Sequence, residues 1–267
     1  MGADTKNLRV RIKSVNSTRH LTKAMGLVAS SKIRRATENM IKSKEFLNSL
    51  DEIVNLLKSC PECNKNPYLN NINNTKTTLI VISGDRGLAG GYNANIFRFM
   101  RSYPNANIIP IGKRACNKYN SQFISSEFFN TNEATQIANK VCEDYKNGNI
   151  HRLGIVGTKY YSIMTQTPEI YWILPLQKND SQINNNILIE QDKNEFLDEI
   201  MPQYVAAKLI SIVRESFASE IAARRMAMDS ADKNAEEMIS NLQLQYNRAR
   251  QSAITQEITE IVAGSGN

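Results

Sequence analysis

The most constraining feature of the sequence is its first long segment, residues 5–58, which contains no proline and one glycine, Gly26. Read from Leu8 in alternating steps of four and three, eleven of fifteen positions are apolar, a pattern typical of a coiled-coil seam. The fifteen positions are Leu8, Ile12, Val15, Arg19, Thr22, Gly26, Ala29, Ile33, Ala36, Met40, Ser43, Leu47, Leu50, Val54 and Leu57. At 1.5 Å per residue the segment predicts a helix of roughly 80 Å, which Pro61 ends.

A second segment of the same kind lies at the other end of the chain, from about residue 202 to 262. Pro202 suits the first turn of a helix, and no further Pro or Gly follows until Gly264. An apolar stripe with many small residues runs along it: Met228, Ala231, Ala235, Met238, Leu242, Tyr246, Ala249, Ala253, Ile258 and Ile261. Because neither stripe is stable in water alone, we predict that the two helices pair as an antiparallel coiled coil.

The middle of the chain has a different pattern, with short β-branched runs alternating with helical ones. The expected strands are 77–83, 107–112, 152–158 and 170–174, and the expected helices are 93–101 and 132–146. This alternation is typical of βαβ units and of a largely parallel sheet. The predicted fold class is therefore α/β, with a Rossmann-like domain at 75–192 between a coiled-coil helix at 1–60 and its partner at 202–264.

A glycine-rich loop, residues 83–93, follows the first expected strand and precedes a helix, the place where phosphate-binding loops lie. Its glycine spacing matches neither the dinucleotide fingerprint nor the Walker pattern, which also requires Gly-Lys-Ser/Thr. We interpret it as a tight strand-to-helix turn whose glycines adopt positive φ. The sequence therefore predicts no nucleotide site and no bound cofactor.

The net charge of +7 indicates an acidic partner, which could be nucleic acid, an anionic membrane or an acidic protein surface. Basic residues dominate the first helix, where Glu38 is the only acid up to Lys44 after residue 5. A nucleic-acid binder would place such charges on phosphates, but no aromatic residue precedes Phe46 to stack on bases. The outer face of a coiled coil, or contact with an acidic protein sleeve, explains the charges equally well.

The inventory of reactive side chains gives no catalytic centre. His20 and His151 are the only histidines, and neither has a recognisable motif around it. Cys60 and Cys63 form a lone C-x-x-C, whereas a structural zinc site usually needs four ligands, so incidental thiols at a helix end are favoured over a metal or redox site. No apolar stretch is long enough to cross a bilayer, and no export signal is present at the N-terminus. The sequence favours a role based on shape, with no catalytic, metal or cofactor site.

Three stretches together resemble the ATP synthase gamma family. They are residues 11–32, which begin RIKSVNSTRHLTKAM, the loop GDRGLAGGYN at 84–93, and residues 222–262, which contain YNRARQ and ITQEITEIV. The resemblance covers both ends of the chain strongly and the middle mainly by the order of its elements. The last stretch is the most specific of the three.

The resemblance implies a non-catalytic rotor subunit of a bacterial-type F1Fo ATP synthase, present in a single copy and not bound to nucleic acid. The two terminal helices would form the shaft inside a hexamer of three alpha and three beta subunits. The middle domain would lie on the membrane-embedded c-ring beside the epsilon subunit. The implied location is the cytoplasmic side of the inner (plasma) membrane, as a peripheral protein.

The resemblance also implies which residues contact the beta and alpha subunits. They are Arg250, Gln251, Thr255, Glu257, Arg224, Met25 and Lys23. Arg250 and Gln251 match a family pair that hydrogen-bonds an acidic catch loop of beta, for which a planar guanidinium is well suited. Met25 matches a bearing position near an acidic beta loop, and packing inside the coiled coil remains an equal alternative for it.

Overall fold

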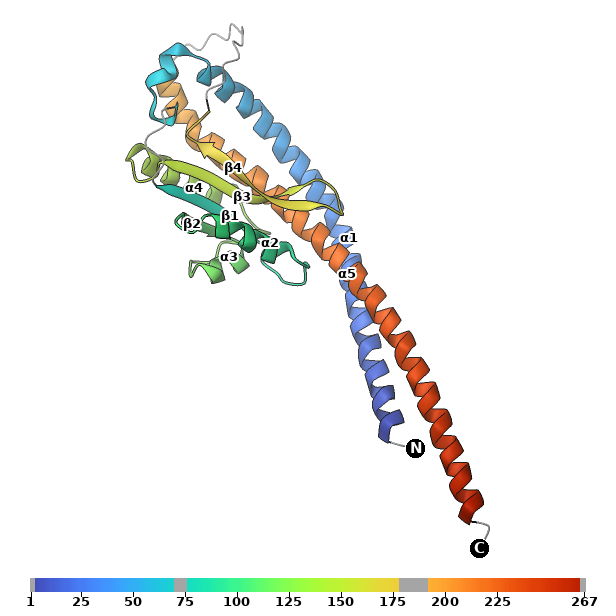
Figure 1. Ribbon diagram of the computed structural model, residues 1–267. Coiled ribbons are helices and arrows are strands. Elements are labelled where there is room, and N and C mark those ends of the chain that lie inside the picture. Colours follow the sequence, from blue (N-terminus) through green and yellow to red (C-terminus); the bar gives the residue numbers. More distant parts are fainter. Residues whose placement is uncertain (1–2, 70–75, 178–191, 265–267) are drawn as a thin grey trace. The chain divides into compact units, whose positions relative to one another are not determined.

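The computed structural model of the protein describes residues 3–69, 76–177 and 192–264 (Figure 1). Two long helices, α1 (Ala3–Lys58) and α5 (Lys193–Gly264), enclose in the sequence a small domain that combines a four-stranded sheet with short helices. This architecture confirms the predicted fold class. None of the helices in the described ranges has an apolar stretch long enough to cross a bilayer.

Helix α1 follows the predicted heptad pattern along its length. All fifteen seam positions are buried or half-buried, including the four that are not apolar, while most positions between them are exposed. Its last regular turn ends at Lys58, and Pro61 begins the short 3-10 helix η1 (Pro61–Lys65), which is followed by η2 (Pro67–Leu69). Pro61 therefore stops the helix as predicted, because proline cannot donate the next helical hydrogen bond.

Helix α5 begins nine residues before Pro202, which lies inside the helix, so the prediction of a first-turn proline was wrong. Asp192 caps the new start, since its Oδ1 accepts from the Asn194 amide at 2.7 Å and from the Glu195 amide at 3.3 Å. Leu197 and Met201 in the first turns are completely buried. Burial of this extra segment outweighs the hydrogen bond that proline removes from the helix interior.

The sheet has the strand order β2-β1-β3-β4. Strands β1 (Thr77–Ile82), β2 (Asn107–Ile111) and β3 (Arg152–Tyr160) are parallel, as predicted, whereas β4 (Gln166–Leu174) pairs with β3 as an antiparallel hairpin. The helices of this domain are α2 (Tyr92–Phe99), which continues into η3 (Met100–Ser102), α3 (Lys113–Lys118) and α4 (Thr131–Lys146). Pro110 is tolerated because β2 is an edge strand.

Successive side chains of the central strands enter two different cores, because side chains alternate between the faces of a sheet. Ile80, Ile82 and Ile155 pack with α4 and with residues of α1 and α5. Leu79 and Val81 point the other way and pack against α2. The run at 79–82 is therefore continuously apolar because both faces of β1 are covered.

The chain divides into two compact units, and both long helices contribute to each. In the described residues, unit 1 comprises 3–30 and 224–264, and unit 2 comprises 31–69, 76–177 and 192–223. The three domains predicted from the sequence, with boundaries at residues 60, 75, 192 and 202, were defined by segments of secondary structure and not by compact units. These domain boundaries stay predictions. Residues 178–191 of the predicted middle domain lie outside the described ranges.

Replacing Lys44 by methionine is expected to lower the free energy of unfolding by about 2 kcal/mol, because it leaves a buried carboxylate without its cation. The Glu215 side chain is 6% exposed, and its Oε1 accepts from Lys44 Nζ at 2.8 Å and from the Tyr160 amide at 3.3 Å. Urea unfolding of the full chain measures the effect. Adding Glu215→Gln should recover part of the loss, and a double variant no more stable than Lys44→Met would contradict the prediction.

Candidate functional site: the exposed end of the helical pair

Unit 1 consists of the first part of α1 and the last part of α5, which lie antiparallel. A methyl group added at Gly26 would lie 3.5 Å from Met228 Cβ, so this glycine allows the two backbones to approach closely. Further along α5, Ala235, Ile239 and Leu242 are each at most 8% exposed. The predicted pairing of the two chain ends is thus present within this unit, with small residues where the helices are nearest.

Arg19 is a polar member of the seam and joins the two helices of unit 1. Its Nε lies 3.2 Å from Asp232 Oδ1, and its Nη2 lies 3.0 Å from Glu236 Oε1. The hydrogen bond that Arg19 donates to Asp232 is the main cause of the raised pKa of Arg19. A guanidinium that bridges carboxylates on successive turns of α5 fixes the register and the rotation of one helix against the other.

Among the described residues of unit 1, the last part of α5 has no partner helix. Every residue from Ile254 to Gly264 is exposed, and large apolar side chains lie among them: Ile254, Ile258, Ile261 and Val262 are 47–69% exposed. At about 100° per residue, Arg250, Gln251, Thr255 and Glu257 fall with these four apolar residues on one arc of about 160°. Ser252, Gln256, Thr259 and Glu260 occupy the opposite side, so the exposed end has an apolar face and a polar face.

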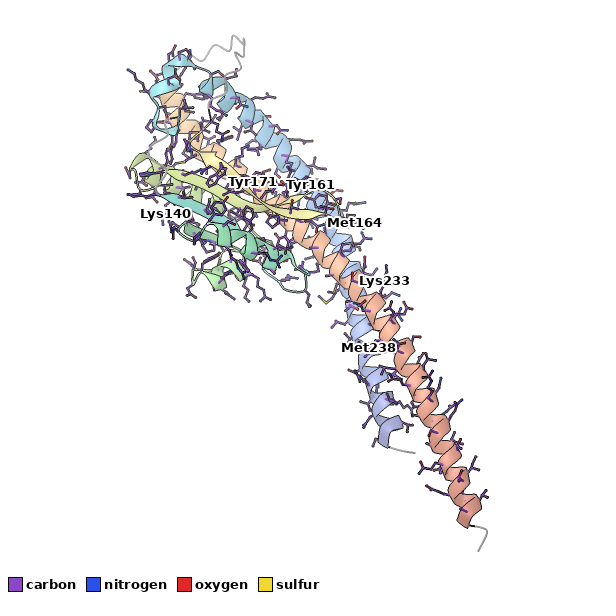
Figure 2. All side chains as sticks on the ribbon, in the orientation of Figure 1. Lys140, Tyr161, Met164, Tyr171, Lys233 and Met238 are labelled. Atoms are coloured by element: carbon purple, nitrogen blue, oxygen red, sulfur yellow. The ribbon has the colours of Figure 1, made fainter. Side chains whose placement is uncertain are left out.

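The predicted stripe on α5 is wrong at three positions. Ile258 and Ile261 are 56% and 69% exposed and do not continue the seam, because α1 begins at Ala3 and supplies no partner there. Met238 is 46% exposed and lies at the edge of the helix pair, where it lines one hollow with Arg11 of α1 (Figure 2 labels Met238), and Ile239 occupies the seam position in its place. The seven other members of the stripe are buried or half-buried.

The four predicted contact residues near the C-terminus therefore share one exposed surface. Arg250 and Gln251 project from consecutive positions, and the Thr255 hydroxyl donates to the Gln251 carbonyl oxygen at 3.0 Å. Such a surface offers hydrogen-bonding groups next to apolar side chains that a partner protein could cover. The contacts themselves stay a prediction, since the structure contains a single chain.

The other three predicted contact residues are not part of this surface. Lys23 is exposed, Met25 is half-buried beside the close approach at Gly26, and Arg224 is half-buried at the start of the α5 segment of unit 1. The half-burial of Met25 leaves both of its interpretations open.

Two features of the site were missed in the sequence. The pairing of Arg19 with Asp232 and Glu236 had a usable signal, because an arginine at a seam position needs an acidic partner across the interface. Ile258 and Ile261 of the apolar face were assigned to the seam, and their separation from the seam could have been found by following the helical period strictly.

Comparison with known proteins assigns the chain to a family. A family model described as ATP synthase matches residues 4–266. The ATP synthase gamma chain of Ruminococcus albus is 38% identical over 287 residues, covering 99% of this chain and 99% of the relative. That of Clostridium perfringens is 36% identical over 277 residues, covering 99% and 98%. The chain belongs to the ATP synthase gamma family.

The same fold occurs in solved structures of greater sequence distance. A chain of the Euglena gracilis mitochondrial ATP synthase, from a structure of OSCP, F1 and c-ring, has a TM-score of 0.70 at 17% identity and covers 99% of this chain and 94% of its own. A chain of the Tetrahymena thermophila enzyme, described as central stalk and c-ring, has a TM-score of 0.63 at 18% identity and covers 79% and 99%. The predicted membership of the gamma family is confirmed.

The glycine-rich loop, which the gamma-family resemblance includes, serves the fold of unit 2. Leu88 and Gly90 have φ of 60° and 56°, and the Gly84 amide donates to Asn93 Oδ1 at 2.9 Å. Gly90 therefore adopts the predicted positive φ, whereas Gly84, Gly87 and Gly91 do not, and the second positive φ of the turn belongs to Leu88. At least one of the amides that a phosphate would require is already bound by a side chain of the loop itself.

Asp85 in this loop organises a neighbouring segment of the gamma-family domain. It accepts hydrogen bonds from the Ser125 hydroxyl at 2.6 Å and from the backbone amides of Lys113, Ser126 and Glu127 at 2.9–3.1 Å. Partial burial alone would raise the pKa of Asp85, but these hydrogen bonds outweigh it and hold the pKa below its usual value. The ionised carboxylate therefore stabilises the fold.

Replacing Asp85 by asparagine is expected to lower the free energy of unfolding by about 1–2 kcal/mol at pH 7, because an amide oxygen accepts these bonds less strongly. Since the folded-state pKa is depressed, the carboxylate's contribution is present above its unfolded-state pKa of about 3.9 and is lost as the pH falls through the folded-state pKa. Urea unfolding at pH 7 and near pH 3 should show the difference between wild type and variant shrinking. A difference independent of pH would contradict the assignment.

The C-x-x-C pair, Cys60 and Cys63, follows the end of α1 and is distant in the sequence from the exposed end of α5. All four cysteines are free thiols, with Cys60 half-buried and the other three buried. Among the described residues, no three His, Cys, Asp or Glu side chains come together as a metal ion would require.

Proposed function

We propose that the chain is the central rotor shaft of an F1Fo ATP synthase and couples proton-driven rotation of the c-ring to ATP synthesis, or to hydrolysis in reverse. The observation that carries the proposal is the end of unit 1, where α5 extends past the start of α1 with one apolar and one polar face. Membership of the gamma family over nearly the full length supports it.

The proposed mechanism follows from the asymmetry of that end. A ring of three catalytic beta subunits would meet in turn the apolar face, on which Arg250 and Gln251 also lie, and the polar face. Because each face binds a given beta conformation with a different free energy, rotation shifts every beta subunit among states of different nucleotide affinity. The close approach at Gly26 and the Arg19 bridge would keep the helices from turning against each other under load.

The proposed partners follow from the same assignment. Residues 1–60 and 202–264 would form the shaft within the hexamer of alpha and beta subunits, with Arg250 and Gln251 on the beta catch loop. Thr255, Glu257, Arg224, Met25 and Lys23 would complete the contacts with beta and alpha. The domain at 75–192 would contact the epsilon subunit and the c-ring. One copy would serve each complex, peripheral to the cytoplasmic side of the cell membrane and without an active site of its own.

Reconstitution with alpha and beta subunits from the same source tests the proposal. We expect a stable complex containing one copy of this chain, whose ATPase rate depends on the chain being present. The isolated chain should neither hydrolyse ATP nor bind DNA in a salt-sensitive manner, as the two rival functions would require. Failure to form a complex with alpha and beta would reject the rotor.

A further inference from the structure

The Cys60–Cys63 pair occupies the connection that follows α1 in unit 2, and the proposed rotor mechanism does not use it. Cys60 is the N-cap residue of η1, and Cys63 is the third residue of that 3-10 helix. The Cys63 amide donates to the Cys60 carbonyl oxygen at 3.1 Å, which closes a single tight turn between the two residues. Both cysteines lie in the described residues and both are reduced.

The turn brings the two side chains together. The Cys60 side chain makes no capping hydrogen bond to the backbone, and its thiol lies close enough to the Cys63 thiol to interact with it. In a turn closed by this hydrogen bond the Cα atoms of the first and fourth residues are less than about 7 Å apart, which is within the range that a disulfide bridges. Burial raises the pKa of the Cys63 thiol to about 11, and the nearby Cys60 adds to the shift.

The two thiols differ in access. Cys60 is half-buried, whereas Cys63 is completely buried and its Sγ donates to the Lys193 carbonyl oxygen at 3.6 Å. The side chain of Lys193 lies over the same turn, with Nζ 3.2 Å from Glu62 Oε1, and Asn194 Nδ2 donates to the Glu62 carbonyl oxygen at 3.0 Å. The turn therefore contacts the first residues of α5 through three polar interactions, and one of them is the hydrogen bond donated by the Cys63 thiol.

We propose that Cys60 and Cys63 form a thiol–disulfide exchange site that a low-molecular-weight disulfide oxidises. The Cys60 thiolate attacks one sulfur of the reagent, so that a mixed disulfide forms on Cys60 and one thiolate leaves. Cys63 then attacks the Cys60 sulfur, gives its proton to the released thiolate, and displaces the second thiolate. Two protein thiols are oxidised to one disulfide, and one reagent disulfide is reduced to two thiols.

Closure of the disulfide removes the S–H group that bonds the Lys193 carbonyl oxygen. The first turn of α5, where the Phe196 amide donates to the Asp192 carbonyl oxygen at 2.9 Å, then loses one of its links to η1. Oxidation should therefore increase hydrogen exchange in the first turn of α5, by at least about threefold at the Phe196 amide. The Lys193–Glu62 ion pair and the Asn194 bond remain, so α5 itself should not unfold.

Trypsin digestion separates the cysteines conveniently. Cleavage after Lys58 and Lys65 yields a peptide, residues 59–65, that contains Cys60 and Cys63 and neither Cys116 nor Cys142. The native full chain is incubated with excess oxidised glutathione, its remaining thiols are alkylated in denaturant, and the digest is analysed by mass spectrometry. We expect this peptide to be two hydrogen atoms lighter and unalkylated, while Cys116 and Cys142 are alkylated.

Two variants test the order of the steps. Cys63→Ser should trap the glutathione adduct on Cys60, because no resolving thiol is present. Cys60→Ser should leave Cys63 reduced, at least about tenfold slower to react than Cys60 in the native chain, and unfolding in urea should abolish that difference. Full alkylation of both cysteines after oxidation, a stable adduct on wild-type Cys60, or pairing with Cys116 or Cys142 would overturn the proposal.

Discussion

Replacement of Gly112 by alanine is expected to lower the free energy of unfolding by about 3–5 kcal/mol, the largest change in stability that we predict. Gly112 has a φ of +90°, and an added Cβ would lie 2.0 Å from the Ser83 carbonyl oxygen. Ser83 cannot move away easily, because its amide donates to the Ile111 carbonyl oxygen at 2.8 Å and its Oγ accepts from the Ala115 amide at 2.7 Å. Either β1 or β2 must shift to admit the methyl group.

Gly148→Ala is the matched control for this prediction. Gly148 also has a positive φ, +72°, but an added Cβ would meet no atom within 4 Å. Gly148→Ala should lower the free energy of unfolding by about 1 kcal/mol, because alanine disfavours a positive φ and no steric clash is added. Urea unfolding of the full chain, followed by circular dichroism, gives both values. Equal losses in the two variants would show that the contact with Ser83 is not what restricts position 112.

The double variant Arg250→Ala with Gln251→Ala is expected to reduce coupled ATP synthesis by about tenfold or more while leaving the isolated chain folded. Both residues are exposed, so their removal costs the isolated chain little. If they bond an acidic loop of beta, each lost bond to a charged group is worth about 1.5–3 kcal/mol, and 1.4 kcal/mol corresponds to a factor of ten. ATP synthesis in inverted membrane vesicles measures the effect.

The control for this variant changes the opposite face of the same two turns. Ser252→Ala with Gln256→Ala removes two polar side chains that lie on the polar face and keeps the helix propensity high. Synthesis should remain close to wild type. Synthesis close to wild type in both double variants would remove Arg250 and Gln251 from the contact surface. An equal loss of synthesis in both would show that the exposed helix is sensitive to substitution on either face.

The sequence predicted the fold well where one local pattern dominated. The heptads of α1 were sufficient because every seam position is buried or half-buried, and the β-branched run at 77–82 was sufficient because both faces of β1 are covered. The start of α5 could not be predicted, because Pro202 obeys a local rule that buried Leu197 and Met201 override through tertiary packing. The antiparallel direction of β4 depends on a short hairpin that periodicity does not reveal.

The candidate site was predictable only in part for a related reason. The helical period places Arg250 and Gln251 on α5 but does not say where the partner helix stops. That limit comes from the relative lengths of two segments distant in the sequence, and it determines that Ile258 and Ile261 are exposed. Their roles came from resemblance to the gamma family, since exposure alone does not identify a partner.

Observation of rotation tests the central claim most directly. Lys140 is an exposed residue of α4 (Figure 2), and a Lys140→Cys variant that also carries Cys60→Ser provides one accessible attachment point for an optical probe. The variant is assembled with immobilised alpha and beta subunits, and ATP is added. The rotor account predicts that the probe turns in one direction for as long as ATP is hydrolysed. Hydrolysis by the assembled complex with a stationary probe would contradict it.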